Sequence, residues 1–460
     1  MVEKMREHNI ILNQVRKLIQ PTDKQREKLN RITKQVLSIL DQVILENKVN
    51  IKRILGGSYA KDTWLNLETD IDIFMLFPID FKEEKFERLG IKIGKTVLEG
   101  HNPKLRYSEH PYVEGIIDNV KINIVPCYDV EIGNWMSSAD RTPFHSRLIE
   151  SKFNDKMRSE TRLLKLFMKS LEIYGAEIKI KGFSGYVCEV LILKYKKFTS
   201  VLEAASDFSK NEVIKWDKKS DVLNINNKTN LTILDPIDNK RNLGAAISNK
   251  SITKFIIASR LFLNKPDKKY FQLDKKIKTT KSINNTITIL FSYKNKPIDT
   301  LWGLINRTLN HLRIQLEKMS FNILKHSAVI DEKGNCALIF LFKELYIQEQ
   351  EIKIGPEVYM KESLEKFLSK NNKNNQLIWI GEDSKINVLQ KRDYTDAKNF
   401  IRHLLTNKIF SSGIAPDLIT ELEKSYRIIE GNEINQLSTK YIWLKNEVNE
   451  LIANDKIFER

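Results

Sequence analysis

The stretch from Gly56 to Pro78 carries side chains whose types and order suit phosphate chemistry. It reads GGSYAKDTWLNLETDIDIFMLFP. A Gly-Gly-Ser turn, which offers backbone N–H groups to an anion, precedes a short helical segment and an apolar strand. That strand carries Asp70 and Asp72 at its start, and residues i and i+2 of a strand point to the same face. Together these groups predict a site for a metal-bound triphosphate, which indicates nucleotidyl transfer.

Nucleotidyl transfer joins a hydroxyl to an α-phosphate and expels pyrophosphate, so positioning and electrostatics do most of the work. Two Mg²⁺ ions held by carboxylates on one strand face can stabilise the attacking and leaving oxygens, and Mg²⁺ prefers hard oxygen ligands. Asp70 and Asp72 suit this role. The residues predicted to favour the phosphates are Gly57, Ser58, Lys61 and Lys165.

A third carboxylate on a neighbouring strand usually binds the metal ion that activates the attacking hydroxyl. The neighbouring strand is predicted over VKINIVPCY, and its residue on the matching face is Asn123. An amide oxygen can coordinate Mg²⁺, but it has no net charge, so it holds the ion less firmly and lowers the hydroxyl pKa less. Asp118 and Asp129 lie at strand ends, and we do not expect either to substitute.

The composition favours an acidic partner. The chain has 460 residues, which predicts two to four domains, and its formal charge is 76 − 59 = +17. Such an excess favours nucleic acid, although a lysine-rich proteome would also explain it. Three widely spaced cysteines indicate neither a zinc site nor a disulfide framework. We expect a reduced, cytoplasmic protein with no signal peptide and no membrane span.

Hydrophobic periodicity divides the first part of the chain. Residues 1–50 predict two helices, the second starting near Pro21 and Thr22. Residues 51–130 alternate strands with one helix, which suggests a mixed sheet in an α/β domain. From residue 140 to 265 the chain becomes helical. The predicted helices are TRLLKLFMKSLEIYG, GFSGYVCEVLILKY and NKSITKFIIASRLFL, and the basic stretch NKPDKKYFQLDKKIKTTKS follows as a domain junction.

Beyond residue 284 the pattern predicts a second mixed region. The predicted elements are the strand TITILFSY, the helix LWGLINRTLNHLRIQLEKM, the strand CALIFLFKELYI, the helix VYMKESLEKFLSKN and the strands NQLIWIGE and INVLQKR. We interpret the region as a ferredoxin-like sandwich, a fold whose order is β-α-β-β-α-β. The last 65 residues of the 460 are predicted to be helical.

Nine short motifs occur together in one order: GGSYAKDTW, DIDIFMLFP, EHPYVEG, VPCYDV, DRTPFH, RLLKLFMK, IYGAE, KGFSGYVCE and DPIDNKRN. With them the chain resembles the archaeal (class I) CCA-adding tRNA nucleotidyltransferases of the polymerase-β superfamily. The resemblance covers most of the chain and is densest from 55 to 260. It implies a multidomain α/β (α+β) protein in three parts. These are a polymerase-β-like nucleotidyltransferase head over 1–150, a helical central domain over 151–272, and a ferredoxin-like or RRM-like tRNA-binding body and tail over 273–460.

The resemblance also implies roles for individual residues. Asp70 and Asp72 fall on two of the family's three metal ligands, and Asn123 stands where the family has aspartate. Ser58 and Lys61 fall where the family holds the triphosphate. Further nucleotide contacts are implied at Thr142, His145, Lys165 and Tyr174, and Arg241 resembles the arginine that reads the base edge of CTP or ATP.

The function implied is template-independent addition of C, C and A to the 3′ end of tRNA from CTP and ATP, with two Mg²⁺ ions. The tRNA would be gripped along its acceptor and T arms, and the family suggests a homodimer. His311 and Arg313 are candidate RNA contacts, or equally residues of a solvated helix face. Two alternatives stay open. One is a poly(A)-polymerase-like nucleotidyltransferase, and the other, motivated by Asn123, is a catalytically impaired tRNA-binding relative.

Overall fold

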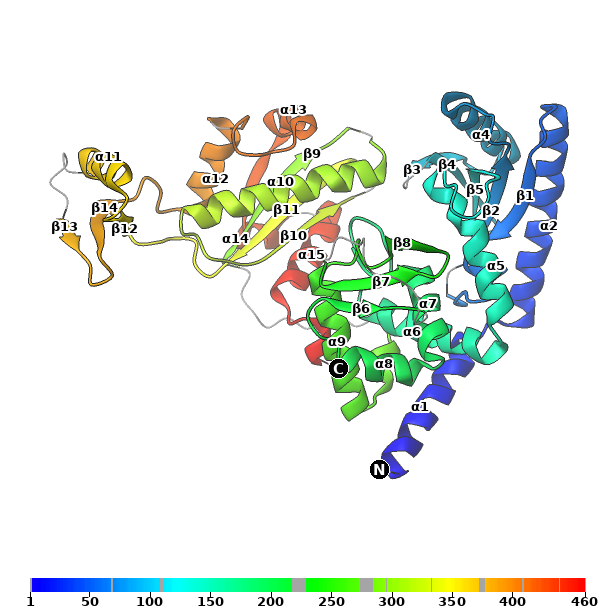
Figure 1. The fold of residues 1–460 in the computed structure, drawn as a ribbon. Helices are drawn as coiled ribbons and strands as arrows, with labels where there is room; N and C mark the ends of the chain where they lie inside the picture. The colour runs from blue at the N-terminus through cyan, green and yellow to red at the C-terminus, as the bar shows by residue number, and fades with distance from the viewer. Residues whose placement is uncertain are drawn as a thin grey trace. The chain divides into compact units, whose positions relative to one another are not determined.

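The chain forms two compact units in the computed structural model (Figure 1). The structure describes residues 2–459 except 68, 108–110, 217–228, 274–283, 295, 332, 372–376, 408 and 438, with side chains from residue 9 onward apart from that of residue 107. The first unit comprises residues 1–275, 297–300 and 455–460, and the second comprises 276–296 and 301–454. Among the described helices, none is both long enough and apolar enough to cross a membrane.

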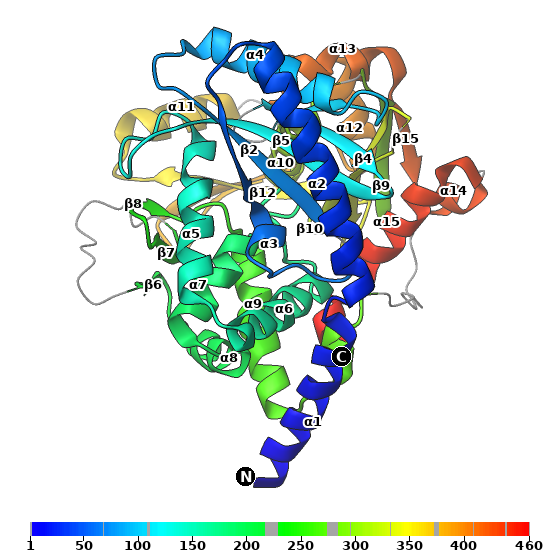
Figure 2. The ribbon, with the colours of Figure 1, turned by 90° about the vertical axis from the view of Figure 1, so that its right-hand side faces the viewer.

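Two helices open the first unit, α1 (Val2–Ile19) and α2 (Asp23–Glu46). The second helix begins where the sequence predicts, because Thr22 forms a capping box with Gln25. The Thr22 hydroxyl accepts from the Gln25 backbone N–H, and the Gln25 side chain accepts from that of Thr22. Two otherwise unpaired donors are thereby satisfied. The apolar face of α2 lies on the sheet that follows (Figure 2).

That sheet has five strands in the order β1-β2-β5-β4-β3. Strands β2 and β5 run parallel, and the other neighbours are antiparallel. The mixed sheet predicted over 51–130 is confirmed. Its predicted strands are IKRIL, IDIFMLF, LRYSEH, YVEGIID and VKINIVPCY, and the end of LRYSEH, at 108–110, lies outside the described residues. The elements are β1 (Lys52–Gly56), α3 (Gly57–Ala60), β2 (Asp70–Phe77), α4 (Glu83–Val97), β3 (Lys104–Tyr107), β4 (Pro111–Ile117) and β5 (Val120–Tyr128).

The alternation of side chains along β2 decides which groups reach the site. Ile71, Ile73, Met75 and Phe77 enter the core that α2 and α4 cover. The intervening residues, beginning with the aspartates, face the other side of the sheet. There Phe74 and Leu76 pack on Cys127 of β5, which leaves the two carboxylates at the start of β2 beyond the apolar contacts.

Helices dominate the rest of the first unit. The elements are α5 (Thr142–Lys152), α6 (Asp155–Ser170), α7 (Gly185–Tyr195), α8 (Phe198–Ser206), β6 (Glu212–Ile214), β7 (Leu231–Asp235), β8 (Asp238–Asn242) and α9 (Asn249–Asn264), with 3₁₀ turns at Ser138–Arg141, Lys268–Phe271 and Lys456–Glu459. The prediction that α6 continues to Gly175 is wrong. The helix ends at Ser170, because Tyr174 pairs with Phe183 in an isolated bridge instead.

The second unit holds a four-stranded sheet in the order β10-β11-β9-β15. Its core is closed by α10, α12 and α13, and α15 packs on β10 and β11. The elements are β9 (Thr286–Ser292), α10 (Ile298–Lys318), β10 (Ile323–Ile330), β11 (Asn335–Phe342), α12 (Ala397–Thr406), α13 (Pro416–Ser425), β15 (Arg427–Glu430), α14 (Gly431–Gln436) and α15 (Ile442–Ile452), with a 3₁₀ turn at Thr439–Tyr441.

The β-α-β-β-α-β order predicted here is present, but partly from other elements. The predicted helix and the two strands before residue 392 do not join the four-stranded sheet. They form a separate sheet, β12-β14-β13, with α11 beside β12. These elements are β12 (Gln350–Glu357), α11 (Lys361–Asn371), β13 (Leu377–Ile380) and β14 (Lys385–Lys391). Strand β10 was not predicted, and β15 interrupts the segment that the sequence predicts to be wholly helical.

The inserted sheet enters and leaves the second unit at one place. The Ile347 N–H donates to the Thr395 carbonyl at 2.9 Å, and the Arg392 N–H donates to the Glu349 carbonyl at 2.7 Å. The Ala397 N–H, at the start of α12, donates to the Leu345 carbonyl at 3.0 Å. The two connections therefore run side by side, and the four-stranded sheet is completed without the inserted strands.

The capping box predicts the effect of Thr22→Ala. Loss of this N-cap should destabilise the first turn of α2 by about 1 kcal/mol, which reduces amide protection there about fivefold. Hydrogen–deuterium exchange of residues 23–26 measures it. Thr96→Ala is the control, since this exposed hydroxyl only donates to the Lys92 carbonyl near the end of α4. Equal protection in Thr22→Ala and the parent protein would contradict the capping role.

Candidate active site

Asp72 lies between two strands that each present a partner to it. Along the parallel pair, Asp72 is aligned with Asn123 of β5, on the matching face that the sequence predicts. The Asn123 Nδ2 donates to Asp72 Oδ1 at 2.8 Å. Asn123 is only 9% exposed, and its Oδ1 is buried without a hydrogen-bond partner among the described residues. Burial raises the pKa of Asp72, although the Asn123 hydrogen bond and the Lys61 charge act in the opposite direction.

The turn before α3 is shaped by the same carboxylate. Gly57 has a φ of +64°, which favours glycine. A Cβ atom at this position would lie 1.7 Å from Asp72 Oδ2. The close approach brings the backbone of Gly57, and Ser58 after it, against the start of β2.

The predicted residues line two cavities that share Asp72. The first is a cleft of about 600 Å³ and the second a cavity of about 400 Å³. The first is lined by Ser58, Asp70, Asp72, Lys165 and Tyr174, together with Lys28, Lys121 and Lys169. The second is lined by Asp72, Asn123, Thr142, His145 and Arg241, together with Ser138, Ser184 and Tyr186. The structure thus gathers Ser58, Lys165 and Tyr174 in one cavity and Thr142, His145 and Arg241 in the other, and Asp72 lines both.

A buried carboxylate anchors the lysines of the first cleft. Glu189 of α7 is 0% exposed. Its Oε2 accepts from Lys61 Nζ at 2.5 Å, and its Oε1 accepts from Thr63 Oγ1 at 2.5 Å and from Lys165 Nζ at 3.2 Å. Lys61 itself is buried, with its Nζ 5.6 Å from the centre of the Tyr186 ring. Its positive charge therefore lies behind the cleft wall.

Helix α6 holds the segment that connects α3 to β2. Arg158 donates to the carbonyl of residue 61, Arg162 to those of residues 62 and 64, and Lys165 to that of residue 63. These side chains follow one another at helical spacing, so they share one face of α6. Arg162 also pairs with the Asp62 carboxylate at 2.7 Å. Every carbonyl from residue 61 to 64 is thereby satisfied by α6.

Asp235, at the end of β7, organises the second cavity. It is 0% exposed. Its Oδ2 lies 2.9 Å from His145 Nε2 and 3.5 Å from Arg241 Nη1, and its Oδ1 accepts from the Tyr186 hydroxyl at 3.2 Å. The His145 and Tyr186 rings stack with centres 3.7 Å apart. Burial lowers the pKa of His145 despite this carboxylate. Burial raises the pKa of Asp235, but the hydrogen bonds to His145 and to the Ile237 N–H, together with the Arg241 charge, lower it overall.

Sequence reasoning missed Glu189, Asp235 and Tyr186. A signal was present for the first of them. Glu189 stands in the otherwise apolar run YVCEVLIL, and a glutamate in a buried helix requires a cationic partner. Nothing local distinguishes Asp235 from the other polar residues of DPIDNKRN, because its partners lie on α5, α7 and β8.

The remaining predicted residues lie in the second unit. His311 and Arg313 belong to α10. His311 is half-buried, and a Cβ atom at Gly413 would lie 2.5 Å from its Nδ1. Arg313 pairs with Glu317 at 2.6 Å and also donates to Asn310. Both side chains therefore have neighbours on or beside their own helix.

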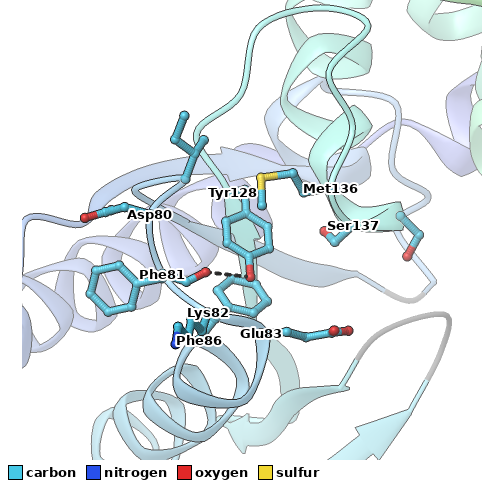
Figure 3. A pocket seen from close by; sticks show the side chains of 10 residues that line it. Asp80, Phe81, Lys82, Glu83, Phe86, Tyr128, Met136 and Ser137 are labelled. Atoms are coloured by element: carbon cyan, nitrogen blue, oxygen red, sulfur yellow. Dashed lines mark hydrogen bonds between the residues drawn. The ribbon is translucent and has the colours of Figure 1, made fainter.

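A separate hollow of about 520 Å³ lies at the far end of β5 (Figure 3). Its wall includes Tyr128, whose hydroxyl donates to the Phe81 carbonyl at 3.2 Å and whose ring stacks on Phe86. The described residues that line it do not include Asp70, Asp72 or Asn123. Its size alone does not make it the site.

The oxygen atoms around Asp72 are of the kind that coordinate a divalent cation. Asp70 and Asp72 supply carboxylate oxygens at the mouth of the first cleft, and the buried Asn123 Oδ1 is an oxygen without a donor. These are hard oxygen ligands of the kind that Mg²⁺ prefers. Within the described part of the chain, no cluster of three or more Asp, Glu, His or Cys side chains suitable for a metal ion occurs.

Comparison with known proteins gives matches along most of the chain. Three family models match: nucleotidyltransferase domain over 35–151, tRNA nucleotidyltransferase second domain over 159–272, and CCA-adding enzyme C-terminal domain over 284–431. The "CCA-adding enzyme" of Saccharolobus islandicus is 32% identical over 401 residues, which is 87% of this chain and 93% of that protein. That of Pyrobaculum islandicum is 32% identical over 417 residues, 86% and 93% of the two chains.

One solved structure, of a cytoplasmic RNA terminal U-transferase, aligns with 57% of this chain and 95% of its own at 13% identity and a TM-score of 0.44.

The position of Gly57 predicts the effect of Gly57→Ala. The new methyl group would meet Asp72 Oδ2, and a residue with a Cβ is strained at a positive φ. We expect a loss of about 1–3 kcal/mol in stability, measured as a lower melting temperature. Gly133→Ala is the control, because that glycine also has a positive φ but nothing within 4 Å of the added Cβ. Equal losses in both variants would show that Asp72 does not contribute.

Burial of His145 predicts its titration. Its folded pKa lies below the ordinary value of about 6.5. The unfolded chain therefore takes up the proton first as the pH falls, so the stability that neutral His145 contributes is present above the ordinary pKa and is lost as the pH falls through the folded pKa. NMR of carbon-13-labelled histidine measures this directly. A His145 signal titrating at or above the ordinary value would contradict the assignment.

Proposed function

This chain belongs to the CCA-adding enzymes, which add C, C and A to tRNA, and we propose that its two adjoining cavities form the site of that reaction. The observation that carries the proposal is the place of Asp72. This one carboxylate lines both cavities, contacts the Gly57 turn and accepts a hydrogen bond from Asn123. A group in that position can face the triphosphate and the attacking hydroxyl together.

We propose that Asp70, Asp72 and the amide oxygen of Asn123 hold Mg²⁺, as two ions. When bound, the ions polarise the α-phosphate and lower the pKa of the attacking 3′ hydroxyl. The protein's own contribution is to keep the carboxylates on one strand face and to hold Asp72 beside Asn123. What supports this assignment is the donor set, because both acids are half-buried and open to the cleft.

The phosphates are proposed to occupy the first cleft. Ser58 and the backbone at Gly57 would donate to them from one wall, and Lys165 and Tyr174 from the other. The last two converge, since a Cβ atom at Gly185 would lie 3.0 Å from the Tyr174 hydroxyl and 3.6 Å from Lys165 Nζ. The excess of lysines around this cleft favours a polyanion over a neutral ligand.

The base is proposed to occupy the second cavity. Arg241 would donate to the acceptor edge that cytosine and adenine share, a ring nitrogen beside an exocyclic amino group. Asp235 supports this role, because it lies 3.5 Å from Arg241 Nη1 and limits the directions that the guanidinium can take. His145 and Thr142 line the same cavity and would contact the nucleotide there.

We further propose that the chain consists of a catalytic head over 1–150, a central domain over 151–272 and a tRNA-binding body and tail over 273–460. The tRNA would be bound along its acceptor and T arms by shape, as A-form RNA requires, by a homodimer in the cytoplasm. Support comes from the charge of +17 and from three cysteines that are all free and buried.

A second candidate function follows from Asn123. With an amide at the third ligand position, the protein would bind tRNA and transfer nucleotides slowly or not at all. The hydrogen bond from Asn123 to Asp72 favours this alternative, because it occupies one carboxylate oxygen that a cation would otherwise bind.

The decisive experiment is incorporation of labelled CTP and ATP into tRNA lacking its CCA end, at several Mg²⁺ concentrations. We expect two C and one A. Asn123→Asp adds a negative charge to the cation site, so it should reach half-maximal activity at an Mg²⁺ concentration lower by on the order of tenfold. It should also melt at a lower temperature in EDTA, because two adjacent carboxylates then repel each other.

Asp72→Asn is the matched control and should abolish incorporation. If only Asn123→Asp incorporates nucleotides, the proposed site is correct but the parent chain is catalytically impaired. That result would support the binding-only alternative. If neither protein adds any nucleotide although both bind tRNA, the proposed site is wrong. Incorporation of ATP alone would point to a poly(A)-polymerase-like activity.

A further inference from the structure

The buried cluster behind the first cleft has two cations and one anion. Lys61 and Lys165 both contact the carboxylate of Glu189, and the only other hydrogen bond to that carboxylate within the described part of the chain comes from the neutral Thr63 hydroxyl. The side chains of Lys61, Lys165 and Glu189 are 6%, 2% and 1% exposed. Asp72 also acts on Lys61, so Lys165 is the cation that has only the shared Glu189 carboxylate. Burying a cation that is incompletely balanced is costly, so the cluster favours an anion on the side of Lys165. Lys165 lines the cleft and provides that side.

The hydrogen bonds of Lys165 are unequal. An ammonium group has three donors, and in this structure they go to Thr63 Oγ1 at 2.9 Å, the Thr63 carbonyl at 3.1 Å and Glu189 Oε1 at 3.2 Å. The contact to the carboxylate is the longest of the three. Glu189 Oε1 also keeps the Thr63 hydroxyl at 2.5 Å, and Oε2 keeps Lys61 at the same distance. Glu189 can therefore lose the Lys165 contact and remain hydrogen-bonded at both oxygens.

We propose that Glu189 is a positioning residue that holds Lys165 in place. When a nucleoside triphosphate binds, the hydrogen bond that Lys165 Nζ donates to Glu189 Oε1 is replaced by one to a phosphate oxygen. Lys61 stays with Glu189 and contributes its charge from behind the wall. The inference rests on the proposed triphosphate role of Lys165. It also explains why a carboxylate lies so close to a phosphate site. Without Glu189, the ammonium groups of Lys61 and Lys165 would repel each other in a buried pocket.

A purely structural role explains less of this arrangement. Buried ion pairs are often no more stabilising than apolar residues of the same volume, and Glu189 is flanked on α7 by residues that are entirely apolar and buried. Its carboxylate nevertheless joins Lys61, which follows α3, to Lys165 on α6. The pKa of Glu189 is lowered by Lys61 and Lys165 against the effect of burial, and burial lowers the pKa of Lys165.

Other groups surround the cluster. Asp72 faces Lys61 from β2, His145 faces it from α5 and Tyr186 from α7. Cys188 of α7 faces Lys165, and Tyr174 faces Glu189 and Asp70. Burial raises the pKa of the Cys188 thiol to about 12 and that of Tyr174 well above its usual range. Neither becomes an anion below pH 9, so the lysines and carboxylates set the charge balance there.

The test is calorimetric binding of CTP with Mg²⁺ and without tRNA, so that no transfer occurs, from pH 6.5 to 9.5. Glu189→Gln keeps the shape but leaves two like charges together, which lowers the pKa of one lysine. The lysine binds phosphate only when protonated. The affinity of Glu189→Gln should therefore fall as the pH rises, by up to about tenfold per pH unit, at pH values where the parent protein still binds.

Glu160→Gln is the matched control. Glu160 of α6 is 4% exposed, pairs with Arg16 at 2.8 Å and accepts from the Phe198 N–H at 2.8 Å. It is a buried glutamate with an arginine partner and no lysine contact among the hydrogen bonds and ion pairs described. We expect its loss to lower the melting temperature while the pH dependence of CTP binding stays that of the parent.

The outcomes separate the two proposals. If the parent does not bind CTP or ATP, the proposed function fails. If the parent binds and Glu189→Gln matches it at every pH, the inference about Glu189 alone is overturned. Should Glu189→Gln not fold, Glu189→Asp replaces it: the charge stays, but the shorter side chain cannot reach both lysines. Weaker CTP binding with an unchanged pH profile then supports the proposal, and parent-like binding with only a lower melting temperature refutes it.

Discussion

The site depends on the conformation of the irregular segment at residues 61–64, and hydrogen bonds from α6 hold its carbonyl groups in place. The chain leaves α3, turns back and enters β2 within a few residues, so no strand or helix of its own satisfies these carbonyls. Arg158, Arg162 and Lys165 donate to them instead. Because these donors belong to the helical part of the first unit, the Gly57 turn is positioned by residues distant in sequence.

Charge is distributed around Asp72 with a clear division. On the side of the first cleft, lysines outnumber carboxylates, which suits phosphates. On the side of the second cavity, a single buried carboxylate, Asp235, orients an imidazole, a phenol and a guanidinium. The first arrangement attracts an ion with little regard to shape, and the second restricts the directions of donors. Asp72 is therefore shared by a cavity lined by several lysines and a cavity organised by one buried carboxylate.

The sequence predicted features that follow from the local alternation of side chains. It missed those that depend on contacts between elements distant in sequence. Alternation in DIDIFMLF places Asp70 and Asp72 on one face, and the matching face of VKINIVPCY identifies Asn123. Partners of Glu189 and Asp235 come from several elements, so no spacing could show them. In the second unit the strands before residue 392 were recognised as strands, but their pairing into a separate sheet is a long-range choice. Strand β15, four residues long, carried too weak a signal.

The paired connections at residues 345–349 and 392–397 have a consequence for how this chain can vary. Since both ends of the inserted sheet meet where Ile347 bonds Thr395, a piece of any length can begin and end there without altering the strand order β10-β11-β9-β15. Segments whose ends lie close together are those that evolution exchanges most readily. The four-stranded sheet of the second unit can therefore keep its register when the inserted segment is exchanged for another of different size.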